Sequence, residues 1–108
     1  MSFILVYTTC SSEDEAALIA DNLLREGLVA CANIIPSMVS LYRWEDKIVQ
    51  DRECIVLLKT IEKNFNSIEK IIIELHSFDR PCIICIPISE INNEFGKWIK
   101  DLTEGIGS

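Results

Sequence analysis

The sequence holds a single histidine among its 108 residues, and it lacks the short motifs that mark many enzymes. It has no glycine-rich phosphate loop, no G-x-S-x-G nucleophile elbow and no H-E-x-x-H zinc motif. One histidine excludes a catalytic histidine pair, and no two carboxylates stand out as an acid and a base. We therefore expect a binding protein rather than an enzyme, with no organic cofactor.

Positive charge is scarce, because 10 Lys and Arg residues stand against 17 Asp and Glu residues, for a net charge of −7. A surface that binds a phosphate backbone needs clustered cations, and the sequence has no basic run. We expect neither nucleic acid nor a membrane surface as a partner. Long apolar runs are also missing, which excludes a transmembrane helix although mean hydropathy is +0.25.

The five cysteines are odd in number and unevenly spaced, and most lie in apolar runs. This usage favours reduced, buried thiols over a disulfide framework. The first residues show neither a basic region nor a small-residue cleavage site, so we expect no signal peptide. Together these features predict a cytoplasmic protein.

What the sequence does contain is an alternation of strand and helix patterns, which we interpret as one domain over residues 1–108. Ser12 followed by Glu15 forms a capping box that opens a helix, and Gly27 ends this helix. The other predicted elements are strands over residues 2–9, 29–42, 48–60 and 82–88, and helices over 61–76 and 93–102. The order βαββαβ plus a terminal helix predicts a ferredoxin-like α+β sandwich with both main helices on one face.

The hairpin between the second and third strands is too long for a compact domain. Residues 29–42 would span roughly 45 Å at about 3.3 Å per residue, less a kink at Pro36. A chain of this length has a radius of gyration of about 13 Å, so the hairpin should overhang. The strands are also apolar on both faces, as in residues 83–86, and a neighbouring subunit must cover the face that the helices leave. We expect an obligate oligomer.

Four residues are the predicted subunit interface or cleft. Tyr42 and Trp44 crowd the hairpin tip, where aromatic side chains serve as anchors against a partner chain or as stacking surfaces for a ligand. Glu53 and Lys59 fall on one face of the third strand. They form either an intersubunit ion pair or part of a cleft lining.

Cys10 and His76 are the candidate metal ligands. His76 falls at the predicted end of the second helix, at the sheet edge where the first strand also ends, which brings it near Cys10. A thiol and an imidazole make a soft site suited to Cu or Zn. A dedicated site uses three or four protein ligands, so Asp79 or a neighbouring subunit would have to complete it. The alternative role for His76 is to cap the helix carbonyls.

Cys82 and Cys85 have the C-x-x-C spacing of metal and redox sites. On a strand, residues i and i+3 point to opposite faces, so the two thiols cannot chelate one ion. We expect both to be structural core residues.

With these residues in view, the chain resembles the CutA family of divalent-cation tolerance proteins. The segments that carry the resemblance are residues 28–36, 40–44, 59–60, 76–81, 87–88 and 98–99. The resemblance implies a ferredoxin-like subunit in a tight homotrimer, similar in architecture to PII signalling trimers, and a cytosolic role in tolerance to copper and other divalent cations. The chain departs from the family pattern at Asp46, where glycine is usual, and at Phe78, where tyrosine is usual.

Two functions follow as hypotheses. The first is a trimeric divalent-metal-binding protein, with copper as the leading ion, that acts in metal tolerance. The second is a PII-like signalling or scaffold trimer that binds a small metabolite or a partner protein at its intersubunit clefts.

Overall fold

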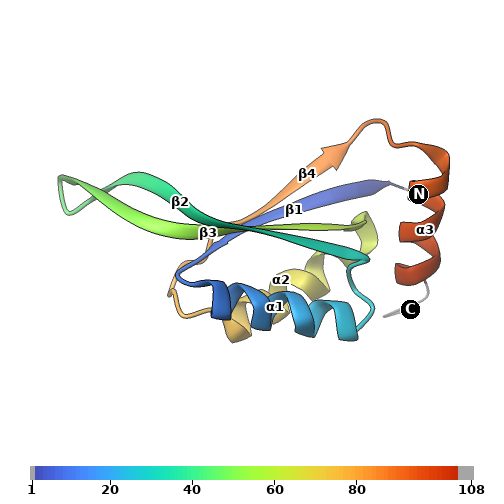
Figure 1. Ribbon diagram of the computed structural model, residues 1–108, viewed down its shortest axis with the longest axis horizontal. Coiled ribbons are helices and arrows are strands. Elements are labelled where there is room, and N and C mark those ends of the chain that lie inside the picture. Colours follow the sequence, from blue (N-terminus) through green and yellow to red (C-terminus); the bar gives the residue numbers. More distant parts are fainter. Residues whose placement is uncertain (1, 105–108) are drawn as a thin grey trace.

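A computed structural model describes residues 2–104 and contains a four-stranded antiparallel sheet in the order β2-β3-β1-β4. The elements are β1 (Phe3–Cys10), α1 (Glu13–Arg25), β2 (Cys31–Trp44), β3 (Lys47–Ile61), a short 3₁₀ turn (Glu62–Asn64), α2 (Phe65–Leu75), β4 (Ile83–Ile88) and α3 (Asn93–Thr103). Helices α1 and α2 lie along one face of the sheet, and α3 packs at the end away from the hairpin (Figure 1). The predicted ferredoxin-like α+β sandwich with a terminal helix is confirmed.

The ends of α1 are fixed by the residues that the sequence indicated. The Ser12 hydroxyl accepts the Glu15 N–H at 3.2 Å. At the other end, Gly27 has a φ of 70°, in the left-handed region that favours glycine. The Leu28 N–H then reaches the Leu23 carbonyl at 3.0 Å and so closes a Schellman motif. Neighbouring residues therefore satisfy the backbone groups at both ends of α1.

The strand alternation sorts the sheet residues into two faces. On β1, the side chains that point toward the helices are Ile4, Val6, Thr8 and Cys10, and all are at most 1% exposed. Their partners on β3 continue this face, and Ile19, Leu23, Ile68 and Ile72 of the two helices close the core. The opposite face has no covering layer in the described chain, and its Ile84 and Ile86 on β4 are 48% and 40% exposed.

The hairpin extends well beyond the helices (Figure 1), and the molecule measures 45 × 27 × 21 Å. A bulge interrupts β2 between Ile35 and Met38, at the predicted kink, and Ser37 there has a φ of 64°. The tip turns through Glu45 and Asp46, with φ values of 48° and 63°. Two successive left-handed residues make a type I′ turn, so the turn that glycine usually supports forms here without one.

The boundaries of α2 correct the prediction of a helix over residues 61–76. Ile61 belongs to β3, because it pairs with Phe3 and is fully buried. The helix begins at Phe65 after the 3₁₀ turn, and His76 is its C-cap with extended backbone, φ −79° and ψ 143°. The spacing of Ile61 to the apolar residues that follow fits a helix. Its burial and its pairing with Phe3 nevertheless keep it in the strand. Within residues 2–104, no helix has the length and apolar character needed to cross a membrane.

Candidate functional site

Cys10 is the last residue of β1, and its side chain points toward the helices. It is fully buried. Burial is the main cause that raises the pKa of this thiol to about 12, with smaller contributions from the nearby Glu15, Cys54 and Glu53. At neutral pH the sulfur therefore keeps its proton unless a cation replaces it.

His76 lies beside the end of β1, as predicted, and its side chain is fully buried. One ring nitrogen, Nε2, is 2.7 Å from the Thr9 carbonyl oxygen, which can only accept a hydrogen bond. The other, Nδ1, accepts the Phe78 N–H at 3.0 Å. These partners assign the proton of the neutral ring to Nε2. The His76 side chain thus joins the end of α2 to β1, and its ring contacts a carbonyl of β1 rather than the carbonyls of the helix.

Glu15 is a third candidate metal ligand at this site. The sequence indicated it only as part of the capping box that begins the first helix. Its carboxylate accepts the Ser11 N–H at 3.3 Å and the Ser77 N–H at 2.9 Å, and it lies 3.9 Å from His76 Nδ1. Partial burial alone would raise the pKa of Glu15, but the hydrogen bonds from Ser77 and Ser11 outweigh it, and the pKa is lowered. Glu15 therefore stays ionised and faces the imidazole.

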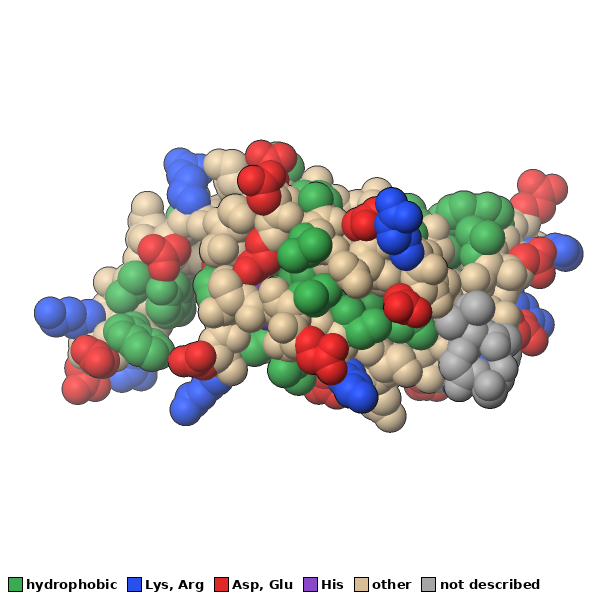
Figure 2. Space-filling view, turned by 90° about the horizontal axis from the view of Figure 1, so that it is seen from below, with side chains coloured by type: hydrophobic (Ala, Val, Ile, Leu, Met, Phe, Trp, Pro, Cys, Tyr) green, Lys and Arg blue, Asp and Glu red, His purple; other side chains and the backbone are tan. Residues whose placement is uncertain are grey.

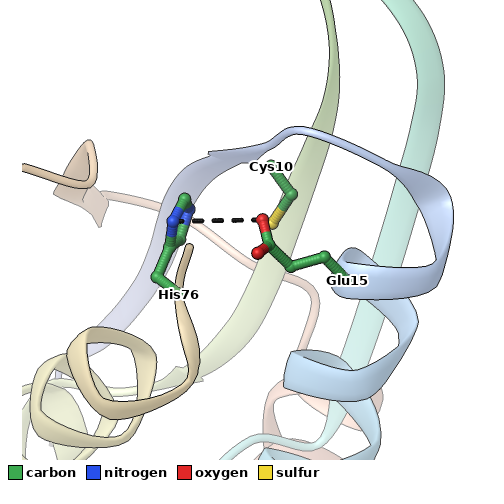
Figure 3. Close-up of side chains that lie close together, drawn as sticks. All are labelled: Cys10, Glu15 and His76. Atoms are coloured by element: carbon green, nitrogen blue, oxygen red, sulfur yellow. Dashed lines mark ion pairs between the residues drawn. The ribbon is translucent and has the colours of Figure 1, made fainter. Parts of the chain in front are cut away.

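One ligand atom from each of Cys10, Glu15 and His76 lies within 4.8 Å of the others. Figure 3 shows the three side chains converging from the end of β1, the first turn of α1 and the end of α2. A sulfur, a carboxylate oxygen and an imidazole nitrogen are the mixed donors that Zn and Cu accept. The third donor is Glu15 rather than Asp79, which instead lines a groove closer to the hairpin.

The predicted interface or cleft residues separate into two places. Tyr42, Trp44 and Glu53 line a groove of about 1060 Å³ between the hairpin and the segment that follows α2. Lys59 lies toward the other end of β3, with its ammonium 5.5 Å from the centre of the Phe95 ring. Among residues 2–104 it forms no ion pair with Glu53. Within a single chain Lys59 therefore lies apart from the other three residues, and the intersubunit ion pair with Glu53 stays a prediction.

Aromatic and charged side chains both line this groove. The Tyr42 hydroxyl donates to the Asp51 carboxylate, which raises the pKa of Tyr42. Arg52 donates to the Ser37 hydroxyl at 3.1 Å and so holds the bulge of β2. The segment after α2 contributes Phe78, Asp79, Arg80 and Cys82 to the wall. Figure 2 shows apolar side chains at the hairpin end of the molecule as well as over its middle and at the opposite end.

Cys82 and Cys85 lie on different sides of the sheet, as the strand argument predicted. Cys85 pairs with Val6 and packs against the core under the helices. Cys82 precedes β4 and lines the groove. Both cysteines are partly exposed, so neither is a fully buried core residue, and only Cys85 packs against the core.

The model of the CutA1 divalent ion tolerance protein family matches residues 4–102. The chain belongs to the CutA family. Relatives in this family include the divalent-cation tolerance protein CutA of Thermus thermophilus, 37% identical over 92% of this chain and 96% of that protein. The corresponding protein of Pyrococcus horikoshii is 38% identical, over 94% of this chain and 98% of its own length.

Solved CutA structures have the same architecture. CutA1 from Oryza sativa has a TM-score of 0.94 at 30% identity, over 97% of this chain and 96% of that one. CutA from Archaeoglobus fulgidus, which is described as periplasmic, has a TM-score of 0.92 at 36% identity, over 94% and 99%. The resemblance found in the sequence is thus confirmed for the family and the fold.

Proposed function

We propose that this CutA-family chain forms a homotrimer that binds divalent metal ions, with copper as the leading ion, and acts in metal tolerance rather than catalysis. The observation that carries the proposal is the convergence of Cys10, Glu15 and His76, whose ligand atoms lie within 4.8 Å of one another. The names of its relatives as divalent-cation tolerance proteins agree with it.

The donors fit copper or zinc in kind and number, but each has another partner. His76 Nδ1 must give up the Phe78 N–H, and the Cys10 thiol, whose pKa is raised to about 12, must lose its proton. Ion binding therefore releases a proton and competes with local hydrogen bonds. We expect modest affinity that falls as pH falls from about 7 to 5, since protons compete for the imidazole and the thiol.

The assembly part of the proposal rests on apolar surface. Trp44 and Ile48 on the hairpin are 63% and 70% exposed in the single chain, and Ile35 on the uncovered sheet face is 45% exposed. Patches of this kind mark contact surfaces in soluble proteins. A trimer in which each hairpin lies across a neighbour would cover both regions, and sedimentation at micromolar concentration tests it. A stable folded monomer would refute the assembly.

Calorimetry with Cu(II), Cu(I) and Zn(II) tests the metal site. Cys10→Ser, Glu15→Gln and His76→Ala should each weaken binding at least tenfold while the trimer persists. Cys85→Ser and Glu13→Gln are matched controls, because they change a thiol and a first-turn carboxylate outside the cluster and should bind as the wild type does. If the three site variants bind like the wild type, the site lies elsewhere.

The five free cysteines support a reducing compartment, so we assign the protein to the cytoplasm. We propose no organic cofactor for it.

A second candidate function, a PII-like signalling or scaffold trimer, is favoured by the groove of about 1060 Å³. Its aromatic walls and the guanidinium groups of Arg52 and Arg80 suit a small metabolite or a partner segment. Calorimetry with common nucleotides separates the two functions. Nucleotide binding that is lost in Trp44→Ala or Arg80→Ala but kept in Cys10→Ser would favour the groove.

A further inference from the structure

Cys54 is the neighbour of Cys10 on the adjacent strand of the sheet. The two residues are directly paired between β1 and β3, and both are buried, at 0% and 5% exposure. The other three cysteines have no cysteine partner in the strand register: Cys31 pairs with Lys59, Cys85 pairs with Val6, and Cys82 precedes β4.

The register also fixes the kind of pair. The Glu62 N–H donates to the Ser2 carbonyl at 2.8 Å, one step beyond the Phe3–Ile61 pair. Hydrogen-bonded and non-bonded pairs alternate along an antiparallel ladder, so Cys10 and Cys54 form a hydrogen-bonded pair with Cα atoms about 5.5 Å apart. That separation lies within the range of roughly 4.4–6.8 Å that disulfides span.

We propose that Cys10 and Cys54 act together as a two-electron donor that reduces Cu(II) to Cu(I). The inference rests on the proposed function, because the Cys10–Glu15–His76 cluster is where Cu(II) would meet the first thiol. It adds an activity, copper reduction, to the binding of copper.

The reaction balances without a further reactant. Two Cu(II) ions each take one electron, the two S–H bonds break, one S–S bond forms, and two protons pass to solvent. The products are two Cu(I) ions and a Cys10–Cys54 disulfide. Two molecules of a small thiol then return the protein to the dithiol form and leave as their own disulfide.

The position of the pair explains why this disulfide would be transient. Ladder hydrogen bonds hold the two backbones at a fixed spacing, and a disulfide that must conform to an imposed geometry is more easily reduced. Oxidation also removes the thiolate from the cluster and leaves Glu15 and His76. Cu(I) prefers soft sulfur ligands, so it is released once the disulfide forms.

The test isolates the pair. A variant with Cys31→Ser, Cys82→Ser and Cys85→Ala retains only Cys10 and Cys54, and its matched partner adds Cys54→Ala. Anaerobic addition of Cu(II) with a colorimetric Cu(I) chelator should give two Cu(I) per chain and consume both thiols in the first variant. The variant that also carries Cys54→Ala should give at most half as many Cu(I) ions per chain. Tryptic mapping of the copper-treated wild type should give a Cys10–Cys54 linked peptide.

Binding of Cd(II), which does not oxidise thiols, separates the two proposals. The inference predicts that Cys54→Ala still binds Cd(II), whereas Cys10→Ser loses it. If the wild type binds copper but keeps both thiols and yields no linked peptide, the redox inference is overturned while metal binding stands. If neither Cd(II) nor copper binds, the proposed function fails and the inference with it.

Discussion

Strand β3 runs through two regions of the molecule that differ in how their apolar side chains are covered. Between Cys54 and Thr60 every second side chain is at most 5% exposed, because α1 and α2 pack on it. Between Lys47 and Arg52 the same strand lies in the hairpin, where Ile48 is 70% exposed. The first region is closed by its own chain, whereas the second leaves apolar residues uncovered in the single chain.

The two candidate sites lie differently with respect to these two regions. The Cys10–Glu15–His76 cluster lies in the closed region, and hydrogen bonds to Thr9, Ser77 and Phe78 fix its side chains within one chain. The groove between the hairpin and the segment after α2 lies where the closed region ends. Its shape therefore depends on how the hairpin is held, and in a trimer on the neighbour.

The largest expected effect is that of Trp44→Ala, which tests whether a side chain that is 63% exposed in one chain belongs to an intersubunit core. If it does, the substitution should destabilise the trimer by about 3–5 kcal/mol per subunit, the range for removing a buried aromatic side chain. The loss should depend on protein concentration, because assembly supplies the stability. Urea unfolding and sedimentation at two concentrations measure it.

Ile73→Ala is the control for this comparison, since Ile73 on α2 is also exposed, at 54%, but lies away from the hairpin. It should change stability little at any concentration. An equally small effect of Trp44→Ala would mean that Trp44 is not an anchor.

Leu58→Ala tests the closed region. Leu58 is fully buried on the helix-covered face, and its truncation should cost about 2–5 kcal/mol. Because the helices of the same chain cover Leu58, the loss should have the same size at low and high protein concentration. A loss that grows on dilution would show that this part of the sheet also depends on assembly.

Glu15→Gln should remove about 1 kcal/mol of stability near neutral pH, the usual size for one net hydrogen-bond contribution. The pKa of Glu15 is lowered in the folded protein, so its contribution is present above the ordinary value of 4.5 and disappears as pH falls through the lowered pKa. The variant should therefore lose less stability than the wild type on acidification below about pH 5. Urea unfolding from pH 7 to 3 checks this, with Glu13→Gln as the control. Parallel curves for Glu15→Gln and the wild type would contradict it.

Much of the fold could be predicted from local sequence chemistry. Ser12 and Gly27 marked the ends of α1 because capping depends on neighbouring residues alone. The start of α2 was wrong because Ile61 is held in β3 by burial against a distant strand. Its helical spacing carried no information about that burial.

Two of the three residues of the candidate metal cluster could be named from the sequence. The topology brought Cys10 and His76 to one edge of the sheet, since each ends an element there. Glu15 was missed as a metal ligand because the capping box already explained its place in the sequence. The signal that could have found it is a carboxylate in the first turn of a helix that begins close to the end of β1. The hydrogen bonds that occupy both His76 nitrogens could not be foreseen, because they depend on backbone groups of Thr9 and Phe78.

The smallest expected effect concerns the hairpin tip, where Glu45 and Asp46 both have left-handed backbone. Asn-Gly is the preferred pair for a type I′ turn, so Glu45→Asn with Asp46→Gly should relieve strain and stabilise the protein by about 1 kcal/mol. The gain should appear as a higher urea midpoint with an unchanged m-value. Ser37→Gly is the control, because Ser37 is also left-handed but its hydroxyl accepts from Arg52, so the strain relieved is offset by a lost hydrogen bond. If the tip variant is destabilised instead, the Glu45 and Asp46 side chains contact a neighbouring subunit, and the tip belongs to the interface that we predict for Trp44.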